Sequence, residues 1–110
     1  MSTRRRPIVV VLTLLLAGSA VVALAEPTPA RQKELIHLVR QDCGSCHGMT
    51  LQGGLGPALL PATLAEKPAE SLVATIIGGR PGTAMPPWHR FLGEDDAQWI
   101  VARLMEGFPK

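Results

Sequence analysis

Two cysteines and a histidine stand close together in the run Cys43-Gly44-Ser45-Cys46-His47. This C-x-x-C-H spacing is that of c-type haem attachment. The two thiols can form thioethers to the vinyl groups on one edge of a haem, and the adjacent imidazole can then bind the iron. The motif therefore predicts one covalently attached haem c, held by Cys43, Cys46 and His47.

A C-x-x-C pair has two other common uses. A thioredoxin-like redox site expects a βαβ context, and no strand is predicted before Cys43. A structural zinc site needs four ligands, and the chain has no second Cys or Cys/His pair with ligand spacing. Haem attachment is therefore the favoured interpretation.

The second axial ligand of the iron decides what the haem can do. A methionine thioether opposite the histidine closes the last coordination position and raises the reduction potential, which suits electron transfer. Met85 lies in a Gly/Pro-rich loop, 38 residues after His47, with Pro86 and Pro87 behind it. This is enough chain to pass around the haem edge, so His47 and Met85 are the predicted iron ligands.

The other candidates for this position are weaker. Met49 follows His47 by two residues and cannot reach the far face of the porphyrin, while Met105 lies on a predicted helix where core packing explains it. His89 is the main alternative and would give bis-histidine ligation, although an exposed surface position is its ordinary role. His37 falls off the apolar stripe of its helix and is expected to face solvent.

Three helices are predicted to position these residues. Apolar residues recur at helical spacing in residues 31–42 (Leu35, Leu38, Val39), in residues 68–77 and in a last helix that starts at Glu94. Residues 44–61 carry five glycines and two prolines and are predicted to be loop, as are residues 80–91. The fold class is therefore all-α, with three main helices and long loops wrapped around the haem.

The size of the chain fits this description. The 110 residues leave room for one domain, and only 4% of them are aromatic. A core of this size gives marginal stability by itself. We therefore expect the haem to complete the core.

The N-terminus resembles an export signal. Arg4, Arg5 and Arg6 precede an apolar run that ends in Ala23-Leu24-Ala25, an A-x-A cleavage site. Residues 1–25 are predicted to be a signal peptide and residues 26–110 the functional domain. An uncleaved membrane anchor is the alternative, because residues 8–25 are uncharged. The rest of the chain is close to neutral and gives no reason to expect nucleic-acid binding.

The mature part resembles the class I cytochromes c over nearly its whole length. The shared features occur in family order: a helix leading into the C-x-x-C-H-G motif, a Gly56-Pro57 pair, the loop Gly82-Thr83-Ala84-Met85-Pro86-Pro87, and a last helix with Trp99. The resemblance implies that the Pro57 carbonyl accepts a hydrogen bond from His47 and so fixes the imidazole. It also implies that Trp99 packs near the first helix.

The short chain, with Cys-Gly-Ser-Cys-His-Gly-Met-Thr and Met-Pro-Pro-Trp, looks like the small NirC-type cytochromes associated with dissimilatory nitrite reductase. This resemblance implies electron donation to the haem-containing nitrite reductase, or supply of electrons during maturation of its haem. Together with the export signal and the predicted iron ligands, we expect a monomeric, periplasmic one-electron carrier that is not an enzyme and whose partners are redox proteins. Two alternatives stay open. In the first, the protein serves in maturation of the reductase haem. In the second, it reacts with gases or peroxide through a labile Met85.

Overall fold

The computed structural model describes residues 25–110, which form six helical elements. The predicted signal peptide lies almost entirely outside the described residues. The elements are α1 Pro29–Leu38, the π-helix η1 Val39–Cys43, α2 Gly44–His47, α3 Pro61–Leu64, α4 Ala69–Gly78 and α5 Glu94–Glu106. The described residues contain no strand, which confirms the all-α prediction.

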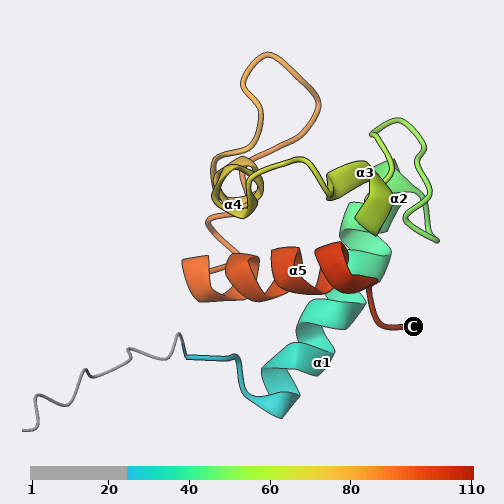
Figure 1. Cartoon of the computed structure of the whole chain (residues 1–110). Coiled ribbons are helices and arrows are strands. Elements are labelled where there is room, and N and C mark those ends of the chain that lie inside the picture. Colours follow the sequence, from blue (N-terminus) through green and yellow to red (C-terminus); the bar gives the residue numbers. More distant parts are fainter. Residues whose placement is uncertain (1–24) are drawn as a thin grey trace, which may run out of the picture.

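The elements α1, η1 and α2 run on as one long helix (Figure 1). It begins at Thr28, whose hydroxyl accepts from the Arg31 N–H at 3.2 Å, and Pro29 occupies the first turn, where a missing N–H costs nothing. The prediction that residues 44–61 are all loop was wrong at its start. The Gly44 N–H donates to the Val39 carbonyl, so the helical hydrogen bonding continues through the attachment motif despite the glycine.

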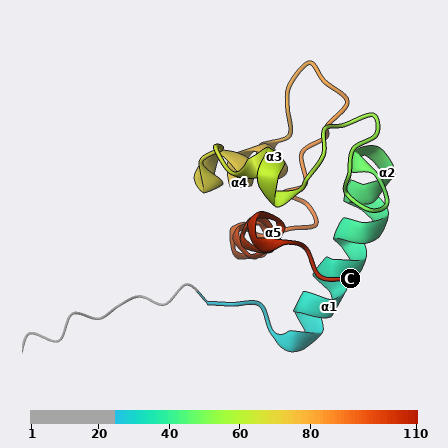
Figure 2. The same cartoon turned by 45° about the vertical axis from the view of Figure 1, so that its right-hand side comes forward.

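The two middle helices lie over one side of α5 (Figures 1 and 2). The short helix α3, with Pro61 in its first turn, was not predicted. The predicted helix 68–77 is confirmed as α4, with Pro68 as its N-cap. Gly79 follows α4 with a φ of +67°, a conformation that glycine adopts without strain.

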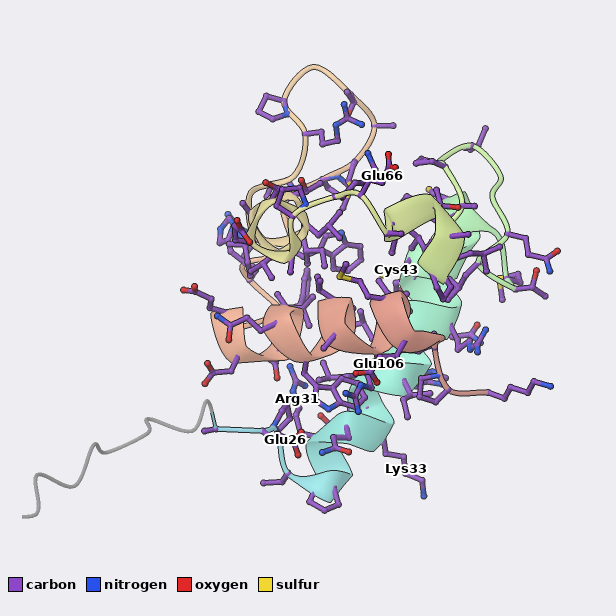
Figure 3. All side chains as sticks on the ribbon, viewed as in Figure 1. Glu26, Arg31, Lys33, Cys43, Glu66 and Glu106 are labelled. Carbon is purple, nitrogen blue, oxygen red and sulfur yellow. The ribbon has the colours of Figure 1, made fainter. Side chains whose placement is uncertain are left out.

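The last helix, α5, crosses the long helix in Figure 1 and is seen nearly end-on beside it in Figure 2. Near the N-terminal ends of the two helices, the Arg31 guanidinium donates to both carboxylate oxygens of Asp96, at 3.3 and 2.9 Å, and to the Phe91 carbonyl at 3.0 Å. Figure 3 shows Arg31 in the space between α1 and α5. This contact joins residues 65 positions apart and fixes the two helices at their N-terminal ends.

A small cluster of buried apolar side chains holds these helices together. Leu35 and Val39 of the long helix are fully buried against Trp99, Ile100 and Leu104 of α5. The position of Trp99 beside the first helix thus agrees with the resemblance. Within residues 25–110 no polar or charged residue is buried, and no helix is both long and apolar enough to cross a membrane.

Candidate haem site

The attachment motif lies at the end of the long helix. Cys43 closes the π-helix η1, and Cys46 and His47 lie in the single turn of α2. A π-helical turn inserts one extra residue into a helix and rotates the residues that follow, and such turns are frequent at functional sites. As a result Cys43 is half-buried and packs against the core, while Cys46 is exposed. One cysteine therefore faces the protein interior and the other faces solvent.

The electrostatics of Cys43 suit a neutral sulfur. Burial, followed by the nearby Asp42 carboxylate, raises the pKa of the Cys43 thiol to about 11. A thiolate is thus disfavoured at this position. A thioether carries no charge at any pH, so converting this sulfur to a thioether places no charge in the apolar surroundings.

The imidazole of His47 is held from one side. Its Nδ1 lies 2.7 Å from the Pro57 carbonyl oxygen, so Nδ1 donates the hydrogen bond and Nε2 is left to bind a metal. The predicted contact between His47 and Pro57 is therefore present in the structure. Such a partner sets the tautomer of a ligating histidine and the orientation of its ring.

Gly56 lets the chain pass close to this ring. A Cβ atom built on Gly56 would lie 2.8 Å from both Nδ1 and Cε1 of His47, closer than a methyl group can approach. The Gly56 N–H donates to the Cys46 carbonyl at 2.8 Å, and the Gly53 N–H donates to the His47 carbonyl at 2.7 Å. The loop is thus fastened to the motif that it covers.

The loop that carries Met85 is fastened to α4. The Trp88 N–H donates to the Ile76 carbonyl at 3.0 Å, and the Met85 carbonyl accepts from the Arg80 N–H at 3.2 Å. A Cβ on Gly79 would lie 2.6 Å from the Pro87 nitrogen, so the backbones of these two residues touch. The Met85 side chain is half-buried, and its assignment as iron ligand stays a prediction.

The remaining candidates lie elsewhere. His89 and His37 are both exposed, Met49 is 57% exposed, and Met105 is half-buried against the core. Within residues 25–110 no three His, Cys, Asp or Glu side chains gather as metal ligands. The zinc alternative for the cysteines therefore finds no further ligands among these residues.

The surroundings of the motif are apolar. Four half-buried side chains border the core cluster: Cys43, Trp88, and Leu72 and Ile76 of α4. In Figures 1 and 2 the Met85 loop and the segment after α2 both lie on the side of α5 that carries α3 and α4. Two thiols, an imidazole with free Nε2 and an apolar border are the groups that a covalent haem requires, so the residues present fit haem c.

Comparison with known proteins decides between the uses of the motif. A sequence-family model described as cytochrome c oxidase, cbb3-type, subunit III matches residues 30–102. The chain is 63% identical over 81 residues to cytochrome c55X of Pseudomonas aeruginosa, covering 74% of this chain and 68% of that protein. This chain belongs to the monohaem c-type cytochromes. It is an electron-transfer protein with covalent haem c on Cys43 and Cys46.

The similarity of this cytochrome extends to solved structures. The c-type cytochrome NirC superposes with a TM-score of 0.73 at 62% identity, over 74% of this chain and 95% of that one. Dihydro-heme d1 dehydrogenase of P. aeruginosa is 40% identical over 74 residues, which are 66% of this cytochrome and 15% of that protein. A domain similar to this cytochrome is thus one part of a longer chain.

Two contacts of the site were not anticipated from the sequence of this cytochrome. The steric role of Gly56 depends on its distance from the His47 ring, and the contact of Gly79 with Pro87 joins a helix end to a loop. Gly56 precedes Pro57, and Gly79 precedes the predicted loop 80–91. Their proximity to a ligand loop was the only signal in the sequence.

Proposed function

We propose that this cytochrome is a periplasmic one-electron carrier that delivers electrons to a haem-containing nitrite reductase. Bound haem c supplies an iron that changes by one electron between the ferrous and ferric states. The relatives named cytochrome c55X and NirC support the class of protein, and the resemblance to cytochromes of dissimilatory nitrite reductase supports the partner.

The observation that carries this proposal is the hydrogen bond from His47 to Pro57. A ring held in this way would keep its orientation when bound iron changes oxidation state, so that little rearrangement would accompany electron transfer. The role assigned to Met85 is to close the opposite position, leaving none open for a substrate. Because its loop is tied to α4 through Trp88 and Ile76, Met85 would be held in place.

Stopped-flow mixing tests the partner. Reduced cytochrome is mixed with oxidised, purified haem-containing nitrite reductase, and the visible spectra of both are followed. The proposal predicts concentration-dependent oxidation of the cytochrome with matching reduction of the enzyme. The absence of electron transfer to an enzyme that accepts electrons from another donor would contradict it.

A second function is favoured by one comparison. The domain similar to this cytochrome in dihydro-heme d1 dehydrogenase, a protein named for an oxidation of a haem, supports a role in supplying or removing electrons during maturation of the reductase haem. Nitrite reductase isolated from cells that lack this cytochrome separates the two functions. Enzyme with its full haem content would favour the carrier, and enzyme deficient in the special haem would favour maturation.

A further inference from the structure

One leucine in the loop after the attachment motif has an unusual backbone conformation. Leu51 has a φ of +62°, and among residues 25–110 it is the single residue other than glycine with a positive φ. In this region the Cβ atom crowds the following carbonyl, so a bulky side chain is strained. Nearby positions with positive φ, Gly48 at +92° and Gly53 at +106°, are glycines. Contacts of the leucine side chain must therefore offset the strain at position 51.

The core supplies these contacts. The Leu51 side chain is 2% exposed and belongs to the cluster that joins the long helix to α5. Burial of a whole leucine side chain is comparable in size to the cost of one residue held in a sparsely populated conformation. A glycine at this position would relieve the strain, but it would also detach the loop from the core. Packing of the side chain thus holds the backbone in the strained conformation.

The backbone of Leu51 makes a hydrogen bond on each side of its left-handed turn. Its N–H donates to the Gly48 carbonyl at 2.8 Å, which closes the turn directly after His47. Its carbonyl accepts from the Leu59 N–H at 2.9 Å, which brings the returning chain back beside that turn. The conformation of Leu51 sets the angle between these two bonds. With an ordinary negative φ the carbonyl would point elsewhere, and the bond from Leu59 would be lost.

The returning chain carries the acceptor for His47. Pro57 lies two residues before Leu59, and its carbonyl oxygen is 2.7 Å from Nδ1 of His47. We propose that Leu51 is a positioning residue, whose buried side chain holds the left-handed backbone that keeps the Pro57 carbonyl on His47. Leu51 thus acts on the imidazole through Leu59 and Pro57.

This inference goes beyond the proposed carrier function, because it concerns how the iron ligand is oriented and holds for any redox partner. The alternative is that Leu51 only fills the core. A residue that fills the core changes the free energy of unfolding, whereas a positioning residue also changes the hydrogen bond of His47 Nδ1. The NMR chemical shift of the Nδ1 proton in the reduced holoprotein reports this bond directly.

Two substitutions at position 51 separate backbone conformation from packing. Leu51→Val removes one methylene and adds a branch at Cβ, which disfavours a positive φ. Leu51→Met keeps an unbranched Cβ and a similar volume. We expect Leu51→Val to move the Nδ1 proton upfield and to raise the reduction potential, because an imidazole with a weaker hydrogen bond is less basic toward bound iron. Leu51→Met should keep both close to their wild-type values.

Leu64 supplies the matched control. It is 3% exposed, belongs to the same cluster and lies in the helix α3. Leu64→Val makes the same change of side chain without a positive φ, so it should lower the free energy of unfolding and leave the Nδ1 proton in place. If both valine variants move this proton equally, or if Leu51→Val leaves it unmoved, Leu51 only fills the core and the inference is overturned.

A measurement on the wild type covers the case in which Leu51→Val does not fold. Hydrogen exchange of the Leu59 N–H and of His47 Nδ1 is followed in the reduced holoprotein at rising denaturant concentration. Because one movement at Leu51 releases both, their free energies of opening should fall with the same slope. A clearly smaller slope for His47 would overturn the inference, since its contact with Pro57 would then break independently of Leu51. A failure to reduce nitrite reductase leaves all these results unchanged, so the two proposals fail separately.

Discussion

The Nδ1 atom of His47 lies 2.7 Å from the carbonyl oxygen of Pro57, ten residues further along the chain. This hydrogen bond connects the attachment turn of the long helix to the loop that folds back over it. Gly56 stands between the two residues and leaves room for the contact. The orientation of the proposed iron ligand is thus set by a loop outside the attachment motif.

Replacement of Gly56 by alanine should disturb this orientation. The added methyl group would lie 2.8 Å from the His47 ring, so the ring or the loop must move. We expect a loss of about 1–3 kcal/mol in the free energy of unfolding, the usual cost of overpacking, with a shifted reduction potential. Chemical denaturation and potentiometric titration of the holoprotein measure the two effects.

Gly78 supplies the matched control, because a Cβ on it meets nothing within 4 Å and it lies in the last turn of α4. Gly78→Ala should leave the potential unchanged and stabilise the protein slightly, if at all. Equal behaviour of the two alanine variants would show that Gly56 does not position His47.

The ion pair between Arg31 and Asp96 should make stability depend on pH. The hydrogen bond from Arg31, assisted by the Gly93 N–H, holds the pKa of Asp96 below its ordinary value. The folded protein therefore binds fewer protons here than the unfolded chain. The contribution of this ion pair to the free energy of unfolding is complete above the ordinary carboxyl pKa of about 4. It is lost as the pH falls through the lower pKa that Asp96 has in the folded protein.

Asp96→Asn removes this contribution. At pH 7 the variant should be less stable by about 1 kcal/mol, and the difference from the wild type should shrink toward pH 3. Denaturant titrations at both pH values measure it. Glu34→Gln removes the more exposed partner of Arg31 and should cost less. A difference between Asp96→Asn and wild type that persists at pH 3 would contradict the assignment.

Removal of both attachment cysteines should prevent correct folding. The described core contains ten buried hydrophobic residues, and several half-buried ones border it, Trp88 and Leu72 among them. Since a core of this size is marginal, the Cys43→Ala, Cys46→Ala double variant should lose covalent haem and most of its helix content in circular dichroism. A well-folded, highly helical apoprotein would show that haem is not required to complete the core.

His89 should be irrelevant to the iron. Its side chain is exposed, in the loop after Trp88. His89→Ala is therefore expected to leave the visible spectrum and the reduction potential of the holoprotein unchanged. A change of ligand-field bands in this variant would revive the bis-histidine alternative.

The sequence was sufficient for the parts of the fold that follow local rules. The apolar stripe of Leu35 and Val39 predicted the buried face of the first helix, and Pro68 marked the start of α4 correctly. Glycine content was misleading at Gly44, which lies buried within helical structure and beside Met49. The C-x-x-C-H spacing predicted the cofactor, since attachment depends only on neighbours in sequence.

Contacts between distant segments could not be predicted in this way. The π-helical turn η1, which ends at Cys43, is a change in helical hydrogen bonding that the apolar stripe of the helix does not predict. The contact of Arg31 with Asp96 depends on how α1 and α5 cross, and that of Gly79 with Pro87 on how the loop returns over α4. These arrangements depend on tertiary structure.

The most direct test of the account is the visible spectrum of correctly matured protein, compared between wild type and Met85→Ala, with and without carbon monoxide. We predict a sharp low-spin reduced spectrum and a weak methionine-sulfur band in the wild type, which does not bind carbon monoxide. In Met85→Ala the sulfur band should disappear and carbon monoxide should bind. A wild-type protein that binds carbon monoxide readily, or a variant with an unchanged spectrum, would contradict His47/Met85 ligation and the carrier function built on it.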